Sequence, residues 1–230
     1  MTSYADYTSP GTQFTYDLNN NLFFKKDPYN YINLLSVKQL NTLGNNSLLD
    51  IFLSRGNVVE PHYHQNAAEL VYCISGAAEV AIMNPFTNQF LHFYIKPGQV
   101  ANVPQGWWHY EIALEDNTHL LAIFDAQTPE VIFGSDILRL TPTNVLAYTY
   151  CLDETKLKES LAPIKQTVIL GPPSNCSYNP SVQGQSANAP IQKQSKVQPS
   201  AANPAMPIIN QNQANSNAMY GHQHRQQQYY

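Results

Sequence analysis

Short runs of alternating or continuous apolar residues recur roughly every ten positions between residues 48 and 124. The runs of strand length are residues 48–53, 69–74, 78–83, 90–95, 109–114 and 119–124. The segments between them are rich in Gly, Pro, Asn and Asp, which favour turns. Regularly spaced short strands joined by such turns predict an all-β fold, namely a closed antiparallel barrel or jelly roll.

A short helix and a change of composition follow these runs. The helix is predicted at residues 153–161, with Asp153 as N-cap and Glu154 four residues before Lys158. From Gly171 onward, the last 60 residues contain 11 Gln, 8 Asn and 7 Pro, and neither Asp nor Glu. This segment has too few large apolar side chains to offset the entropy of ordering, so we expect it to be disordered. The predicted parts are an N-terminal extension (1–30), a barrel (31–170) and a disordered tail (171–230).

Charge limits the classes of partner. Only 12% of the residues are charged, about half the fraction in an ordinary soluble domain. The net charge is −4 and the 12 Lys and Arg form no cluster, so we expect no nucleic-acid partner. The longest apolar runs are far shorter than the roughly 18 residues of a membrane helix, so we expect no membrane contact. Residues 1–21 lack the apolar run of a signal peptide, so we expect a cytoplasmic protein, with a spore or cell-surface coat as the alternative.

Four side chains form a pattern that is typical of a metal site. His62 and His64 are two residues apart, so in an extended chain both point to the same side. A turn directly after them would bring Glu69, at the start of the next run, back beside the two imidazoles. A second turn, at residues 104–106, brings His109 to the start of a strand. Three imidazoles and one carboxylate then meet and leave two positions of an octahedral ion open.

A single histidine on a strand is most often an ordinary residue of the fold, but the combined spacing here is specific. It consists of His-x-His, a Glu five residues later and a Gly seven residues beyond that, followed by Gly-x5-Pro-x-Gly-x2-His. Imidazole and carboxylate ligands suit manganese, iron or nickel, and zinc and copper are also compatible. An ion with open positions can act as a Lewis acid on a small substrate.

These two stretches match both signature motifs of the cupin superfamily, and the resemblance covers roughly residues 30–165. Within the superfamily, the chain is most similar to one domain of the oxalate decarboxylases and to their germin-like relatives. The similarity rests on Asn66-Ala67-Ala68-Glu69-Leu70, on Ile74-Ser75-Gly76, and on residues 120–125 followed by Leu140-Thr141-Pro142. It implies a double-stranded β-helix barrel with a manganese site formed by the four residues above. A typical decarboxylase has two such barrels, and this chain has one.

Several positions depart from the enzymes that the chain resembles. Val59 stands three residues before the first ligand, where the decarboxylases carry an Arg and the germin-type oxidases an Asn. A valine offers no hydrogen bond to oxalate. Ala113 replaces the Asn that commonly ends the second motif. The loop at residues 126–136 corresponds to the lid of the decarboxylases but is a few residues shorter, and Glu130 is its only Glu, which makes it the candidate proton-transfer group of the lid.

Strand parity suggests further carboxylates near the ion. Glu111 is predicted to share the face of His109, and Glu60 that of His62. Either could act as a general acid or base there. The alternatives are that Glu60 lies in solvent at the barrel mouth and that Glu111 has a structural partner. We take Glu130 and Glu111 as the predicted catalytic residues.

The resemblance implies a metal-dependent decarboxylase or oxidoreductase that acts on a small carboxylate. Two alternatives stay open. One is a non-catalytic cupin with a structural role, such as a spore-coat component whose tail mediates assembly. The other is a cupin dioxygenase or isomerase with another substrate, since one fold hosts many activities. Because cupin barrels often pair through their sheets and exposed strand edges invite association, we expect a homo-oligomer.

Overall fold

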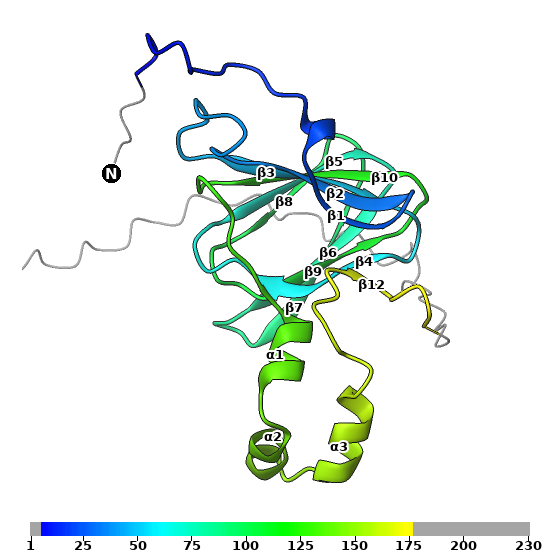
Figure 1. Cartoon of the computed structure of the whole chain (residues 1–230). Coiled ribbons are helices and arrows are strands. Elements are labelled where there is room, and N and C mark those ends of the chain that lie inside the picture. The colour runs from blue at the N-terminus through cyan, green and yellow to red at the C-terminus, as the bar shows by residue number, and fades with distance from the viewer. Residues whose placement is uncertain (1–5, 177–230) are drawn as a thin grey trace, which may run out of the picture. The chain divides into compact units, whose positions relative to one another are not determined.

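The computed structural model describes residues 6–176, and two antiparallel sheets lie one over the other in this part of the chain (Figure 1). The first sheet has the strand order β1 (Leu22–Asp27), β2 (Asn30–Leu35), β3 (Ser47–Leu53), β10 (Thr118–Phe124), β5 (Glu69–Ser75) and β8 (Val100–Val103). The second has the order β11 (Ile132–Phe133), β4 (Val58–Tyr63), β9 (His109–Ala113), β6 (Ala78–Asn84) and β7 (Gln89–Ile95), and β12 (Leu170–Gly171) pairs with β4. The predicted all-β jelly-roll architecture is confirmed.

The six predicted runs all form strands. They correspond to β3, β5, β6, β7, β9 and β10, with ends that differ from the predicted ones by at most about one residue. The sequence reasoning did not predict β1, β2 or β8 as strands. β1 lies within residues 1–30, the predicted N-terminal extension. It pairs with β2 through a tight turn at Pro28 and Tyr29. This part of the chain therefore adds a strand to the edge of the first sheet.

The core lies between the two sheets and follows the two-residue alternation of strands. In β5, Val71 and Cys73 are fully buried, whereas Leu70 and Tyr72 face outward and keep more than a third of their surface exposed. β10 alternates in the same way. Burial of apolar surface contributes about 25 cal/mol per Å², so these inward rows supply the main stabilisation of the barrel. The same alternation turns the polar candidates at the strand ends inward.

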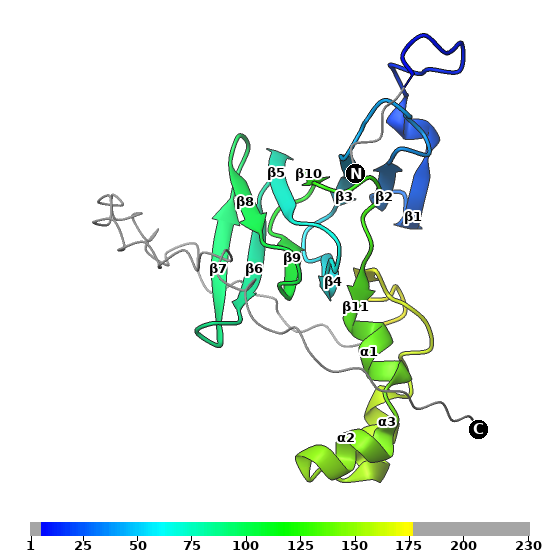
Figure 2. The same cartoon turned by 90° about the vertical axis from the view of Figure 1, so that its left-hand side faces the viewer.

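Three short helices follow the barrel strands: α1 (Gly134–Leu140), α2 (Thr143–Tyr150) and α3 (Glu154–Leu161). The predicted helix is confirmed as α3, because Asp153 accepts a hydrogen bond from the N–H of Lys156 (3.1 Å) and Lys158 pairs with Glu154 (2.7 Å). α1 and α2 were not predicted, and α1 with β11 occupies the second half of the expected loop at residues 126–136. Figures 1 and 2 both show α2 and α3 extending away from the sheets.

The ends of the described region contain one further element and only a small part of the predicted tail. A 3₁₀ turn, η1 (Leu18–Asn20), precedes β1 and is capped by Asp17. The predicted disordered tail lies outside the described residues apart from residues 171–176. Within residues 6–176, no helix has both the length and the apolar character needed to cross a membrane.

Candidate metal centre

β4 places the first two histidines at its C-terminal end. His62 lies in β4 opposite His109 of β9, and His64 follows directly after the strand. The pairing of β4 with β9 is irregular between Val59 and His62. Such a bulge changes which face the following side chains point to. As a result, Val59 and His62 both line the same small interior cavity.

The predicted turn after His64 brings Glu69 back beside the two histidines. Asn66 fixes this turn: its amide group donates to the carbonyl of Thr128 (2.9 Å), and its side-chain oxygen accepts from the N–H of Glu130 (2.9 Å). Sequence reasoning did not assign Asn66 a role, although it forms part of the segment that carries the resemblance. The turn delivers Glu69 to the start of β5 with only 3% of its surface exposed.

The turn at residues 104–106 brings the last histidine to the same place. The N–H of Gly106 donates to the carbonyl of His64 (2.9 Å), so this turn is tied directly to the segment that carries the first ligands. β9 then begins at His109, which is fully buried. The two motifs, about 40 residues apart in the chain, therefore meet through a main-chain contact as well as through their side chains.

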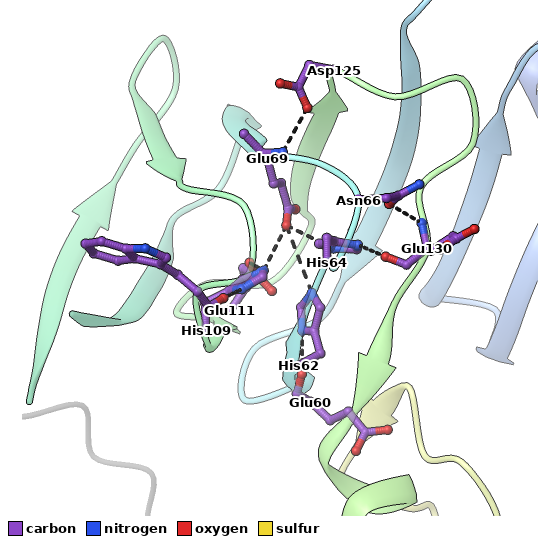
Figure 3. A network of polar contacts seen from close by, with 11 residues as sticks. Glu60, His62, His64, Asn66, Glu69, His109, Glu111, Asp125 and Glu130 are labelled. Atoms are coloured by element: carbon purple, nitrogen blue, oxygen red, sulfur yellow. Dashed lines mark hydrogen bonds and ion pairs between the residues drawn. The ribbon is translucent and has the colours of Figure 1, made fainter. Parts of the chain in front are cut away.

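The four side chains converge on one point (Figure 3). One ligand atom from each of His62, His64, Glu69 and His109 lies within 4.8 Å of all the others, and all four residues are buried. Glu69 Oε2 is 4.0 Å from His62 Nε2, 3.3 Å from His64 Nε2 and 2.8 Å from His109 Nε2. His64 Nε2 has no hydrogen-bond partner among the described residues. The cluster can hold a metal ion.

The other ring nitrogen of each histidine is held by the main chain. The Nδ1 atoms lie 2.7, 2.7 and 2.9 Å from the carbonyl oxygens of Glu60, Glu130 and Trp107, respectively. Because a carbonyl only accepts, each Nδ1 donates, which leaves the neutral ring's lone pair on Nε2. Metal-ligating histidines are oriented in this way in proteins generally. The donor set and its orientation therefore fit a divalent cation.

Charges at the cluster interact strongly. Burial disfavours the charged form of Glu69, but the hydrogen bond from His109 and the nearby imidazole of His64 outweigh it and hold the pKa of Glu69 well below its usual value. Burial also opposes a charge on His109, yet its hydrogen bond to Glu69 and the carboxylate of Glu111 raise the pKa of His109 to about 9. Burial and the neighbouring charge on His109 keep the pKa of His62 well below 6.5. The cluster thus holds an ion pair between Glu69 and His109.

Glu111 lies beside the cluster, on the same face of β9 as His109, as parity predicts. Its Oε1 is 3.7 Å from His109 Nε2, and the residue is 1% exposed. Neither carboxylate oxygen has a hydrogen-bond partner among the described residues. Burial, together with the charge on Glu69, raises the pKa of Glu111 to about 8.

Glu60 points away from the cluster, contrary to the parity prediction, because of the bulge before His62. Its Oε1 accepts hydrogen bonds from the N–H groups of Val168 (3.1 Å) and Ile169 (2.6 Å) and from the hydroxyl of Ser135 (2.9 Å). Its Oε2 accepts from the N–H of Ser135 (2.8 Å). The buried Glu60 carboxylate therefore ties the start of α1 and the segment before β12 to the strand that carries the histidines.

Glu130 contacts the cluster through its main chain rather than its side chain. Its carbonyl accepts from His64, whereas its exposed carboxylate accepts from the side-chain amide of Gln65 (3.1 Å). The two predicted catalytic residues thus occupy different surroundings: Glu111 is buried next to His109, and the carboxylate of Glu130 lies at the surface.

A small cavity opens beside two of the histidines. It has a volume of about 40 Å³ and is lined by His62 and His64 and otherwise by apolar side chains from both sheets, from residues 129–133 and from Ile169 before β12. Val59 is one of these side chains, at the position where the resembled enzymes carry a polar residue. A ligand in this cavity would therefore find hydrogen-bonding or charged partners only at the metal cluster.

Comparison with known proteins identifies the class. Residues 26–158 match the model of a protein family described as Cupin, which is more than half of the chain, so this chain belongs to the cupin family. Germin-like protein 1-2 of Oryza sativa subsp. japonica is 30% identical over 123 residues, which cover 51% of this chain and 54% of that protein. Glycinin G4 of Glycine max is 25% identical over 109 residues, which cover 47% and 19%. The chain spans about half the length of the germin-like relatives that it matches.

Solved structures share the fold. Oxalate decarboxylase from Bacillus subtilis superposes with a TM-score of 0.60 at 22% identity, covering 74% of this chain and 47% of that one. Oxalate oxidase in complex with the substrate analogue glycolate gives a TM-score of 0.61 at 17% identity, covering 70% and 86%. At these identities the likeness shows the barrel, which agrees with the fold class predicted from the sequence.

Proposed function

We propose that the protein is a metal-dependent cupin that binds a divalent cation through His62, His64, Glu69 and His109, with manganese as the preferred ion. The observation that carries this proposal is the convergence of three Nε2 atoms and one carboxylate oxygen, with every Nδ1 held by a carbonyl. A bound cation would supply a Lewis acid for a small ligand. The protein's own residues orient the ligating atoms and bury them away from water.

The substrate class that fits this site best is a small carboxylate. A carboxylate oxygen binds a hard divalent cation well, and two of the structural neighbours are oxalate enzymes by name. The cavity gives such a ligand apolar surroundings, since Val59 stands where an Arg or Asn would bind oxalate in the resembled enzymes. The negative charge of the substrate must therefore be balanced at the metal. Within this proposal, proton transfer is assigned to Glu111 or Glu130.

A non-catalytic role is the second candidate. The observation that favours it is the cavity itself: about 40 Å³ with an apolar lining leaves little room for a substrate beside the cluster. In this role the cation would stabilise the barrel, because an ion that binds only the folded state shifts the folding equilibrium toward it.

Elemental analysis of the purified full chain, together with His109→Ala, tests the metal site. We expect close to one divalent ion per chain in the wild type and loss of the ion in the variant. His92→Ala is the matched control, since His92 is half exposed and pairs with Glu79 outside the cluster (2.6 Å). A wild type that binds no ion, or a His109→Ala variant that retains it at full occupancy, contradicts the proposal.

The metal-loaded protein should then be incubated with oxalate, glycolate and other small carboxylates. Carbon dioxide, formate or hydrogen peroxide above the level of the His109→Ala variant supports the catalytic role. Full metal occupancy without any product, combined with a higher melting temperature than the metal-free protein, supports the structural role instead.

A further inference from the structure

The carboxylate of Glu111 is buried without a hydrogen-bond partner among the described residues. The residue is 1% exposed, and neither of its side-chain oxygens accepts a hydrogen bond within residues 6–176. Burying an isolated carboxylate costs several kcal/mol. A buried polar group without a partner therefore needs an explanation, such as an ion or a water molecule at the site.

The neighbours of Glu111 on both adjacent strands are apolar. In register, it lies opposite Val59 of β4 on one side and Val80 of β6 on the other, and both valines are buried. No donor is supplied from these two positions. The ion pair that the described residues offer Glu111 is with His109, whose Nε2 lies 3.7 Å from Oε1. Because this nitrogen belongs to the metal cluster, a cation bound there is the partner within reach.

The spacing agrees with shared ligation. Metal–ligand bonds are about 2.0–2.3 Å long, so two ligand atoms of one ion lie about 3 Å apart on adjacent positions and up to about 4.5 Å apart on opposite ones. The 3.7 Å between Glu111 Oε1 and His109 Nε2 falls within this interval. Glu111 is not among the four residues whose ligand atoms all lie within 4.8 Å of one another, so ligation requires its carboxylate to turn toward the ion. No hydrogen bond to the described residues holds the carboxylate in its present position.

We propose that Glu111 is a second carboxylate ligand of the same cation, an inference that rests on the proposed metal site and that leaves proton transfer to Glu130. Two carboxylates balance the charge of a divalent ion inside the barrel. They also shift the preference of the site toward ions that favour oxygen ligands, such as manganese.

A fifth protein ligand also restricts the substrate. Three imidazoles and two carboxylates occupy five positions of an octahedral ion and leave one exchangeable position. Oxalate could then not chelate the ion through two oxygens. The ligand class that fits is a small molecule bound through a single oxygen, such as a monocarboxylate.

Counting the exchangeable water molecules on bound Mn²⁺ tests this inference. Water-proton relaxation of the full chain loaded with Mn²⁺ should report one water molecule on the ion in the wild type and two in Glu111→Gln. The same substitution should weaken Mn²⁺ binding by about 10- to 100-fold in competition with a chelator. Glu79→Gln is the matched control, because Glu79 is also buried on a neighbouring strand but pairs with His92. This control should retain the wild-type water count and affinity.

The outcomes separate the two proposals. Two water molecules on Mn²⁺ in the wild type overturn the ligation by Glu111, whatever the affinity of the variant, and leave the four-residue metal site intact. This measurement does not depend on the folding of Glu111→Gln. A wild type that binds no Mn²⁺ overturns the proposed function and this inference together.

Discussion

His109 donates from Nε2 to Glu69 and from Nδ1 to a main-chain carbonyl, so in the metal-free protein both ring nitrogens are engaged as donors. A ring that donates from both nitrogens is protonated. This agrees with the pKa of about 9 that the surrounding carboxylates give it. A cation must therefore displace a proton from His109 before it can use Nε2.

We accordingly expect metal binding at pH 7 to release about one proton from His109, and most of a second proton from Glu111 if this residue ligates the ion. The affinity should rise with pH until it passes about 9. The affinity rises with pH because, below the raised pKa of His109, the ion-free site holds this proton and the occupied site does not. Calorimetry of Mn²⁺ binding in two buffers with different ionisation enthalpies measures the release. Equal apparent enthalpies in both buffers would contradict it, and His92→Ala should behave as the wild type.

The convergence of the four candidate ligands could be predicted because the spacing within each motif is local. The His-x-His pair and the short turn before Glu69 leave little freedom, and β9 is regular, so parity also placed Glu111 correctly. Glu60 could not be predicted in the same way. Parity assumes an unbroken two-residue repeat, and the bulge between Val59 and His62 breaks it. Pro61, which lies in this interval, is a residue that is typical of bulges in interior strands, and the parity argument did not take it into account.

At the scale of elements, six of the strands were predictable and the first two helices were not. The strands carry a strong apolar alternation, which local sequence reports directly. α2 has the sequence TNVLAYTY, in which Thr, Val and Tyr are weak helix formers. These helices form through their place in the tertiary structure, since α2 packs against α3. Local propensity could not show that contact.

The turn after β5 gives an element-scale prediction. Gly76 has φ +69°, and an added Cβ would lie 2.5 Å from Thr118 Oγ1 and 2.7 Å from Thr118 Cα. Gly76→Ala should therefore destabilise the protein by about 2–5 kcal/mol, through left-handed strain and a clash with the main chain of β10. Gly56→Ala is the matched control: φ is +81° but no atom lies within 4 Å of the added Cβ. It should cost only about 1–2 kcal/mol. The free energy of unfolding of both variants is measured by urea denaturation. Equal losses in the two variants would contradict the role of the Thr118 contact.

At the scale of the whole molecule, the helical arm α1–α3 exposes several large apolar side chains. Its apolar side chains are largely exposed, including Leu140 (65%), Tyr148 (92%) and Tyr150 (66%). Clusters of exposed apolar residues mark interaction sites in soluble proteins. The homo-oligomer that the sequence predicts would have a contact surface here.

We expect light scattering of the full chain to give a mass of at least two chains. Leu140→Glu combined with Tyr148→Glu should reduce it toward one chain, because charges at a buried contact are costly. Lys156→Glu is a control on the same arm, since this side chain is exposed and polar. A wild type of monomer mass, or a double variant with unchanged mass, would contradict the assignment of the arm.

The three carbonyl oxygens that hold the histidine rings have a consequence for how this site tolerates sequence change. They come from Glu60, Glu130 and Trp107, but the atoms in use are common to all residues. The side chains at positions 130 and 107 can therefore drift without turning a ligand ring. Insertions and deletions in residues 105–108 or 128–131 do turn the ring, because they move the carbonyl oxygen itself. Conservation of segment length, more than of residue type, is what keeps this centre in place.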